Sequence, residues 1–129
     1  MAQNITKSTK DMVQHALATV PAISVDDAIA LAGSPDHVFV DLRDGTEQAK
    51  TGMIPGAFAS SRGMMEFHID PASPAHKPAL AQDKTYVFYC ASGGRSALAA
   101  QVAMDMGLSP VVNLTGGIGA WAKSGGPLE

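Results

Sequence analysis

Three short apolar runs, rich in β-branched and aromatic residues, are spaced along the chain with helical patterns between them. The runs are HVFVDL (37–42), TYVFYC (85–90) and PVVNL (110–114). A strand with one face in water shows a regular alternation of apolar and polar residues. These runs lack that alternation, and its absence is typical of strands buried on both faces. Buried strands separated by helices predict an α/β fold with a mostly parallel sheet and helices on both faces.

An amphipathic helix is predicted over residues 8–20, ahead of the first run. Ser8, followed three residues later by Asp11, resembles a capping box. One face of this helix carries three apolar side chains, Val13, Leu17 and Val20. We therefore divide the chain into an N-terminal helical extension (1–21) and a domain (22–129). The sequence leaves open whether the extension caps a monomer or joins a homodimer.

The clearest helix is predicted over residues 96–106, directly after TYVFYC. Its apolar side chains fall on one stripe, Leu98, Val102 and Met106, and Gly107 is a typical C-terminal cap. Shorter helices are expected near residues 25–32, 46–50 and 116–126. Residues 68–83 contain three prolines and are expected to form an irregular loop.

Cys90 is the only cysteine, and it ends the strand predicted over residues 85–90. Binding sites of open parallel sheets lie beyond the carboxyl ends of their strands. The loop that follows is Ala91-Ser92-Gly93-Gly94-Arg95, and a helix opens near Ser96. The glycines let N–H groups turn inward, while Arg95 and the helix N-terminus add positive charge. These features favour a thiolate, whose pKa falls from ~8.5 to roughly 3.5–7.5 in such surroundings. Alternatively, Cys90 is an inert buried side chain beside a tight connection.

Four stretches, in order, resemble the rhodanese-type sulfurtransferases. CASGGRS (90–96) resembles their active-site loop, which often reads C-x-S-G-x-R-S. VDLRD (40–44), MIPGA (53–57) and LTGGIGAW (114–121) resemble the strand end, the G-H-I-P-G-A turn and the closing L-x-G-G-x-x-x-W segment of that family. The similarity covers about residues 22–129. It implies a rhodanese-like three-layer domain, with about five mostly parallel strands flanked by helices.

The resemblance implies that Cys90 carries a sulfane sulfur as a persulfide. The thiolate would take the sulfur from a small anionic donor of the thiosulfate or 3-mercaptopyruvate type. A thiol, cyanide or a sulfur-carrier protein would then accept it, in a two-step displacement through a covalent intermediate. We expect no cofactor, because the intermediate is covalent. A disulfide oxidoreductase would need a second, resolving cysteine, which the chain lacks.

The resemblance also implies supporting roles for two residues at the end of the first run. In the family the aspartate that matches Asp41 organises the active-site region through hydrogen bonds, and the arginine that matches Arg43 is largely structural. From the residues alone, a solvated ion pair at a strand end is the alternative. Arg62 is a candidate for the pocket rim, with an ordinary surface arginine as the alternative.

Three positions depart from some thiosulfate-using relatives. Those relatives carry extra cations where this chain has Ala91, Ser92 and Glu47. Arg95 is then the only cation of the loop that could attract a dianion, which favours 3-mercaptopyruvate, a protein persulfide or another donor over thiosulfate.

Three other functions remain as alternatives. The first is a non-catalytic or sensory binding module that uses the same pocket. The other two are phosphatase and arsenate reductase chemistry. Phosphatases with a related loop use Cys-x5-Arg, whereas Cys90 and Arg95 give Cys-x4-Arg. The shorter loop suits a sulfur atom better than a phosphoryl group, and arsenate reductases have a longer loop too.

Charge and composition disfavour several further partners. The formal net charge is −3, so no basic face for nucleic acid or an anionic membrane is expected. No apolar run reaches the length of a membrane span. The four histidines show no paired metal-ligand spacing, so no metal is expected. A single cysteine and the lack of an apolar leader indicate the cytoplasm.

Overall fold

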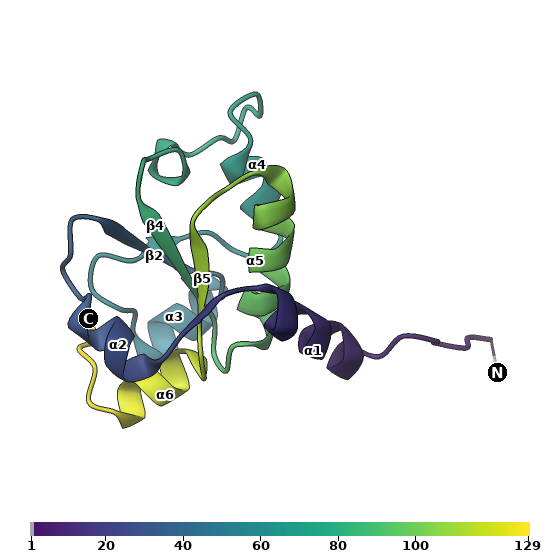
Figure 1. Cartoon of the computed structure of the whole chain (residues 1–129), viewed down its shortest axis with the longest axis horizontal. Helices are drawn as coiled ribbons and strands as arrows, with labels where there is room; N and C mark the ends of the chain where they lie inside the picture. The colour runs from purple at the N-terminus through teal and green to yellow at the C-terminus, as the bar shows by residue number, and fades with distance from the viewer. Residues whose placement is uncertain (1) are drawn as a thin grey trace.

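A five-stranded parallel sheet forms the centre of the protein, in a computed structural model that describes residues 2–129 (Figure 1). The strands are β1 (Ala22–Ile23), β2 (His37–Asp41), β3 (Phe58–Ala59), β4 (Thr85–Tyr89) and β5 (Val111–Leu114). Their order is β1-β5-β4-β2-β3, and every neighbouring pair is parallel. The three apolar runs are therefore the three central strands. The predicted α/β class and strand arrangement are confirmed.

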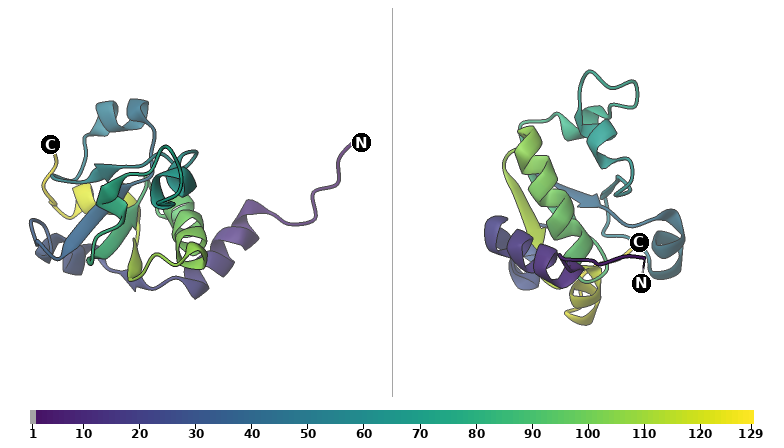
Figure 2. Two further views of the ribbon diagram at one scale, coloured as in Figure 1. Left: turned by 90° about the horizontal axis from the view of Figure 1, so that it is seen from above. Right: turned by 90° about the vertical axis from the view of Figure 1, so that its right-hand side faces the viewer.

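Helices cover both faces of the sheet, giving three layers (Figure 2). They are α1 (Thr9–Thr19), α2 (Val25–Ala30), α3 (Gly45–Thr51), α4 (Met65–Ile69), α5 (Gly94–Met106) and α6 (Gly117–Lys123), with a 3-10 turn at Pro78–Leu80. Side chains of α4 and α5 pack into the core on one face, and those of α2 and α6 into the core on the other. No helix within residues 2–129 has the length and apolar character needed to cross a membrane.

Alternate residues of the central strands feed these two cores. Val40, Tyr86 and Phe88 pack beneath α5, and Phe39, Val87 and Tyr89 pack beneath α6. Trp121 of α6 is fully buried, lies edge-on to Phe39 with ring centroids 5.6 Å apart, and donates its indole N–H to the carbonyl of Pro127 at 2.8 Å. The period of two along each strand thus directs alternate side chains to the two faces of the sheet.

Helix α1 begins as predicted, because the Ser8 hydroxyl accepts a hydrogen bond from the Asp11 N–H at 3.0 Å. The predicted apolar face is only partly correct. Leu17 is half exposed, while Ala16 and Val20 are buried. The reason is that α1 lies against α5, and the small side chain of Ala16 lets the two helices approach each other closely.

The predicted helix α5 is present, but its most deeply buried residues are alanines and not the larger apolar residues of the stripe. Ala99, Ala100 and Ala103 are fully buried, whereas Met106 is 41% exposed and Leu98 and Val102 are only partly buried. Helix α5 contacts β4 and β5 on one side and α1 and α4 on others. Because small side chains allow such close packing on several sides, the alanines rather than the larger residues face the core.

We expect Ala100→Leu to lower the free energy of unfolding by about 1–3 kcal/mol, because three extra carbon atoms overpack a filled interface. Urea denaturation followed by circular dichroism measures this change. Met106→Ala, on the exposed side of the same helix, is the matched control and should change the free energy by less than about 0.5 kcal/mol. Equal effects of the two substitutions would contradict the assignment of the buried face.

Candidate active site

Cys90 directly follows β4 at the carboxyl edge of the sheet. Its side chain is 1% exposed, and the loop of residues 91–93 folds around it before α5 begins at Gly94. Asp41, the last residue of β2, stands in register with Tyr89, the residue before Cys90. The strand ends therefore bring Cys90 and Asp41 to one edge, as the sequence predicts for parallel strands.

Backbone N–H groups surround the sulfur of Cys90. Gly93 donates to Sγ at 3.2 Å and Ser96 at 3.4 Å. Gly93 adopts a φ of +106°, a left-handed conformation that glycine reaches without strain and that turns its N–H toward the sulfur. The predicted inward-facing cradle of N–H groups is therefore present. It positions donors around an atom that is otherwise removed from water.

These donors control the pKa of the Cys90 thiol. Burial by itself raises the pKa, but the Ser96 hydroxyl and the N–H groups of Ser96, Gly93 and Ser92 outweigh burial and lower it below its ordinary value. Only the backbone of Ser92 takes part. A lowered pKa increases the fraction of thiolate at neutral pH, which is the form that acts as a nucleophile.

Asn113 of β5 is a buried polar residue of the site that the sequence reasoning missed. Its amide N–H donates to the carbonyl of Gly93 at 3.2 Å, and its amide oxygen accepts from the Ser96 hydroxyl at 2.6 Å. The Ser96 hydroxyl also lies 3.3 Å from the Gly93 carbonyl. Asn113 therefore ties β5 to both ends of the turn into α5. In the sequence, the sign of this buried role is that Asn113 is the single amide residue inside the apolar run PVVNL.

Asp41 and Arg43 form a fully buried ion pair, so the alternative of a solvated pair is excluded. The guanidinium donates from Nη2 to Asp41 Oδ2 at 2.8 Å and from Nε to Oδ1 at 3.1 Å. Its remaining donors reach the Thr51 hydroxyl and the Gly52 carbonyl, each at 2.7 Å. Every guanidinium nitrogen is thus satisfied, as a buried charge requires. The pair joins the end of β2 to α3.

Arg95 and Arg62 both face acidic partners. Arg95 makes a bidentate ion pair with Glu47 of α3, with Nη1 to Oε1 and Nη2 to Oε2 both 2.8 Å. Arg62 pairs with Glu66 at 2.8 Å and does not line the pocket described below. The guanidinium of Arg95 is therefore directed at α3. Sequence reasoning named Glu47 only as a missing cation and did not predict this contact.

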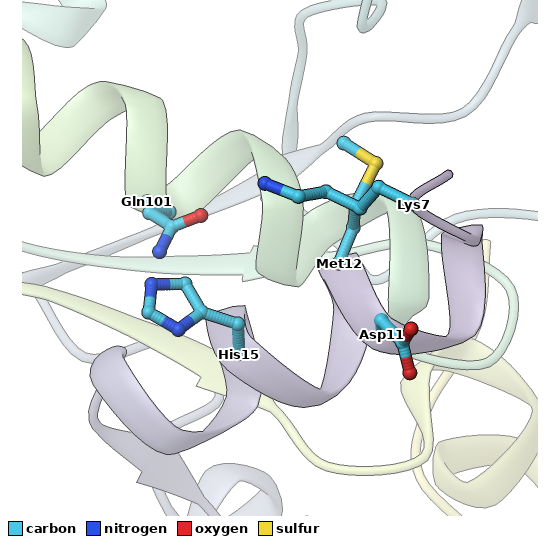
Figure 3. A pocket seen from close by; sticks show the side chains of 5 residues that line it. All are labelled: Lys7, Asp11, Met12, His15 and Gln101. Atoms are coloured by element: carbon cyan, nitrogen blue, oxygen red, sulfur yellow. The ribbon is translucent and has the colours of Figure 1, made fainter. Parts of the chain in front are cut away.

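A pocket of about 330 Å³ lies beside the backbone of the Cys90 loop. Its wall is formed by Glu47, Lys50 and Thr51 of α3, Ala91 of the loop, and Ile118 and Gly119 of α6, together with Arg43. A second hollow of about 300 Å³ lies between α1 and α5 and is lined by Lys7, Asp11, Met12, His15 and Gln101 (Figure 3). Only the first borders the Cys90 loop, so it is the candidate substrate pocket.

The start of α6 supports the Cys90 loop from outside. The N–H of Ile118 donates to the Cys90 carbonyl at 2.9 Å, and the N–H of Gly119 donates to the Ala91 carbonyl at 3.1 Å. Gly117 has a φ of +62°, and a Cβ placed there would lie 2.6 Å from both carbonyl oxygens. Only glycine fits this close approach. The GGIG segment therefore supports the loop.

Metal binding would need side chains in the described part of the chain that are grouped as ligands. Among residues 2–129, no group of three or more His, Cys, Asp or Glu side chains is arranged to hold a metal ion. Nδ1 of His68 lies 2.8 Å from the Ser60 hydroxyl. The chemistry available at this edge is that of a thiolate, N–H donors and two ion pairs.

Comparison with known sequences places this architecture among characterised proteins. The sequence model of the rhodanese-like domain matches residues 24–124. A sulfurtransferase of Allochromatium vinosum is 39% identical over 98 residues, which is 76% of this chain and 83% of that protein. The human thiosulfate:glutathione sulfurtransferase is 30% identical over 114 residues, covering 83% of this chain and 97% of that protein.

Two solved structures are similar to this chain over most of its length. A Rhodopseudomonas palustris protein, described as of unknown function and a possible tyrosine phosphatase, matches with a TM-score of 0.96 at 51% identity, covering 100% of this chain and 99% of that one. The human single-domain sulfurtransferase matches with a TM-score of 0.67 at 30% identity, covering 81% of this chain and 96% of that one.

We expect Ser96→Ala to raise the pKa of Cys90, because the hydroxyl that favours the thiolate is removed. The rate of iodoacetamide alkylation, measured against pH, falls as the thiolate is protonated on lowering the pH. In Ser96→Ala this fall should occur at higher pH than in the wild type. Ser92→Ala is the control, since Ser92 acts through its backbone N–H alone, and it should leave the profile in place. Coincident profiles for all three proteins would contradict the role of the Ser96 side chain.

We expect Gly117→Ala to displace the Cys90 loop, because a Cβ 2.6 Å from two carbonyl oxygens forces the backbone to move. Cysteine alkylation at neutral pH should slow several-fold as the N–H groups leave the sulfur. Gly33→Ala is the matched control, because Gly33 also has a positive φ (+81°) but no atom within 4 Å of an added Cβ. Equal alkylation rates in the two variants would refute the steric role of Gly117.

Proposed function

This chain belongs to the rhodanese-like domain family, and we propose that it is a single-domain sulfurtransferase that carries the transferred sulfur as a persulfide on Cys90. The observation that carries the proposal is the buried sulfur of Cys90 with N–H donors of Gly93 and Ser96 at 3.2 and 3.4 Å. The family and the sulfurtransferase relatives described above support the reaction type. The donor class and the persulfide mechanism are what the resemblance to this family implies, and the N–H donors around Cys90 support them.

The first step loads the cysteine. With thiosulfate as donor, the Cys90 thiolate attacks the outer sulfur, the S–S bond of thiosulfate breaks, and sulfite leaves with both bonding electrons. One negative charge stays on the terminal sulfur of Cys90 and two leave on sulfite, so the three charges of the reactants are conserved. The N–H groups of Gly93 and Ser96, which face Sγ, are placed to stabilise the anionic persulfide in the same way as the thiolate.

A donor of the 3-mercaptopyruvate type fits the same cysteine. The thiolate attacks the donor sulfur, the C–S bond breaks, and the electron pair passes to the enolate of pyruvate. The proton of the donor thiol ends on that carbon, which gives pyruvate and the Cys90 persulfide. Each reactant and each product then carries one negative charge.

The second step transfers the sulfur to an acceptor. A thiolate acceptor attacks the terminal sulfur of the persulfide, the S–S bond breaks, and the Cys90 thiolate is restored. One human relative is named a thiosulfate:glutathione sulfurtransferase, which supports a thiol as the acceptor class. Cyanide would serve as an acceptor in an assay. Both steps use only the cysteine and its N–H donors, so we propose that no cofactor takes part.

Phosphatase chemistry is the rival reaction, because a structurally similar Rhodopseudomonas palustris protein is described as a possible tyrosine phosphatase. Two observations favour sulfur transfer. The loop has four residues between Cys90 and Arg95, one fewer than the phosphatase pattern. In addition, both terminal nitrogens of Arg95 are occupied by Glu47, so the guanidinium does not face into the loop to hold a phosphoryl group.

A non-catalytic binding module is the second rival. Such a module has no need for an ionised cysteine. The N–H donors and the Ser96 hydroxyl lower the pKa of Cys90 despite its burial, which is an arrangement suited to a nucleophile. The hydrogen-bond donors around the sulfur therefore favour catalysis over binding alone.

We expect intact-mass measurement to show a gain of one sulfur atom after incubation with thiosulfate or 3-mercaptopyruvate, and loss of that atom after cyanide is added. Cys90→Ser should show no gain and no transfer, since its hydroxyl does not form a persulfide. Thermal unfolding of the variant should match the wild type. If neither donor adds the mass of a sulfur atom and the protein hydrolyses p-nitrophenyl phosphate, the proposal is wrong and phosphatase activity takes its place.

A further inference from the structure

We propose that α1 is part of the active site: Val13 packs on Gly94 and thereby holds the first turn of α5, which carries N–H donors of Cys90. Val13 is a positioning residue, since it acts through Gly94. As a role in catalysis this rests on the proposed sulfurtransferase function, and it assigns that role to a helix outside residues 24–124, the segment matched by the family model. The test measures the cysteine thiol, so its outcome does not depend on sulfur transfer.

Val13 covers the bare side of Gly94. A Cβ placed on Gly94 would lie 3.6 Å from Cγ2 and 3.9 Å from Cγ1 of Val13, which are van der Waals distances. Gly94 lies between Gly93 and Ser96, the two residues whose N–H groups donate to Sγ of Cys90. A shift of Gly94 would therefore move these donors relative to the sulfur.

The Gly93–Gly94 pair needs support from outside, because two adjacent glycines give the backbone wide conformational freedom. For Gly93 the support comes from β5 and the start of α6, since the Leu114 carbonyl oxygen and the Gly116 nitrogen lie 3.5 Å from a Cβ placed on it. Outside its own helix and its chain neighbours, the described residues bring only the two methyl groups of Val13 within 4 Å of a Cβ on Gly94. Helix α1 thus gives Gly94 the support that β5 and α6 give Gly93.

The packing of α1 as a whole fixes the place of Val13. Ala16 is fully buried and Val20 is 5% exposed, and they follow Val13 by three and seven residues. This spacing puts the three side chains on one face of the helix, the face that lies against α5. Figures 1 and 2 show α1 across the end of α5 at which that helix begins. The contact with Gly94 is therefore one end of a continuous helix interface.

A second link joins the N-terminal extension to the same turn. The N–H of Asn113 donates to the carbonyl of Pro21 at 2.8 Å, and Ala22 is paired with Asn113 in the sheet. The side-chain amide of Asn113 donates to the carbonyl of Gly93 at 3.2 Å. The segment that follows α1 is thus connected to Gly93 through two hydrogen bonds. Gly93 is the neighbour of the residue that Val13 contacts, so α1 and the segment after it both support this turn.

The charges near the thiol stay the same when Val13 is replaced by another apolar residue. Arg95 is a cation whose charge interacts with that of the Cys90 thiolate, and Glu47 is its partner. The titratable side chains of α1 are all exposed, and they are Lys10, Asp11 and His15. A change in the pKa of Cys90 in such a variant therefore reports the placement of the N–H donors.

The test is the pH dependence of iodoacetamide alkylation of Cys90 in the full-length protein. We expect the profile of Val13→Ala to move up by about half a pH unit, because the N–H donors that favour the thiolate are held less closely. Below the pKa of the thiol, sulfur transfer should slow about threefold, which is the same loss of thiolate. Val13→Ile keeps both branches at Cβ and should leave the profile in place.

Two control variants separate positioning from stability. Leu17→Ala shortens a side chain that is 49% exposed on the same helix, and it should leave the profile unchanged. Ser8→Ala removes the hydroxyl that caps α1 by accepting the Asp11 N–H at 3.0 Å, so it weakens the helix without altering Val13. Ser8→Ala should lower the melting temperature and leave the alkylation profile in place.

The outcomes distinguish this inference from the proposed function. Coincident profiles of Val13→Ala and the wild type would overturn the inference. An equal shift in Ser8→Ala and Val13→Ala would overturn it as well, since α1 would then act only through the stability of the fold. If Val13→Ala alone shifts the profile and the wild type takes sulfur from no donor, Val13 positions the thiol donors and the proposed sulfurtransferase function fails.

Discussion

The close contact between the start of α6 and the carbonyls of Cys90 and Ala91 is the constraint on which the site depends. Two N–H groups of α6 hold these carbonyls outward, and the absence of a side chain at Gly117 allows the approach. With the carbonyls fixed, the following N–H groups turn inward to the sulfur. The same helix places Trp121 in the core. Packing of α6 and the geometry of the cysteine loop are therefore coupled.

The two ion pairs of this edge differ in what they do. The buried Asp41–Arg43 pair has all its nitrogens bonded and fixes α3 on the end of β2, so removing one partner would leave an uncompensated charge in the core. The Glu47–Arg95 pair is partly exposed and contributes little to stability. The first pair positions α3, and α3 in turn presents the second pair at the pocket.

Much of this arrangement could be predicted from the sequence because it follows from local patterns. Apolar runs without alternation gave the central strands, and a cysteine at the end of one of them lay at the edge where parallel sheets place their sites. The buried face of α5 could not be predicted from hydrophobicity, because hydrophobicity favours Leu98 over alanine while close packing on several sides favours small residues. The contact of Arg95 with a residue 48 positions away depends on where α3 docks, which no local pattern encodes.

Dipoles, more than a full positive charge, stabilise the thiolate of Cys90. This explains how the site can activate a thiol without attracting every anion. A full positive charge beside the sulfur would favour the thiolate and also draw dianions from solution, because its field extends over a Debye length of about 8 Å. The groups that lower the pKa of Cys90 are instead a hydroxyl and N–H dipoles, whose influence falls off more steeply with distance. Arg95 is bound by Glu47 and is not among the largest causes that lower the pKa of Cys90, although its charge interacts favourably with that of the thiolate. Activation of the nucleophile therefore depends chiefly on the dipoles of its own loop, and Arg95 adds a longer-range attraction to anions.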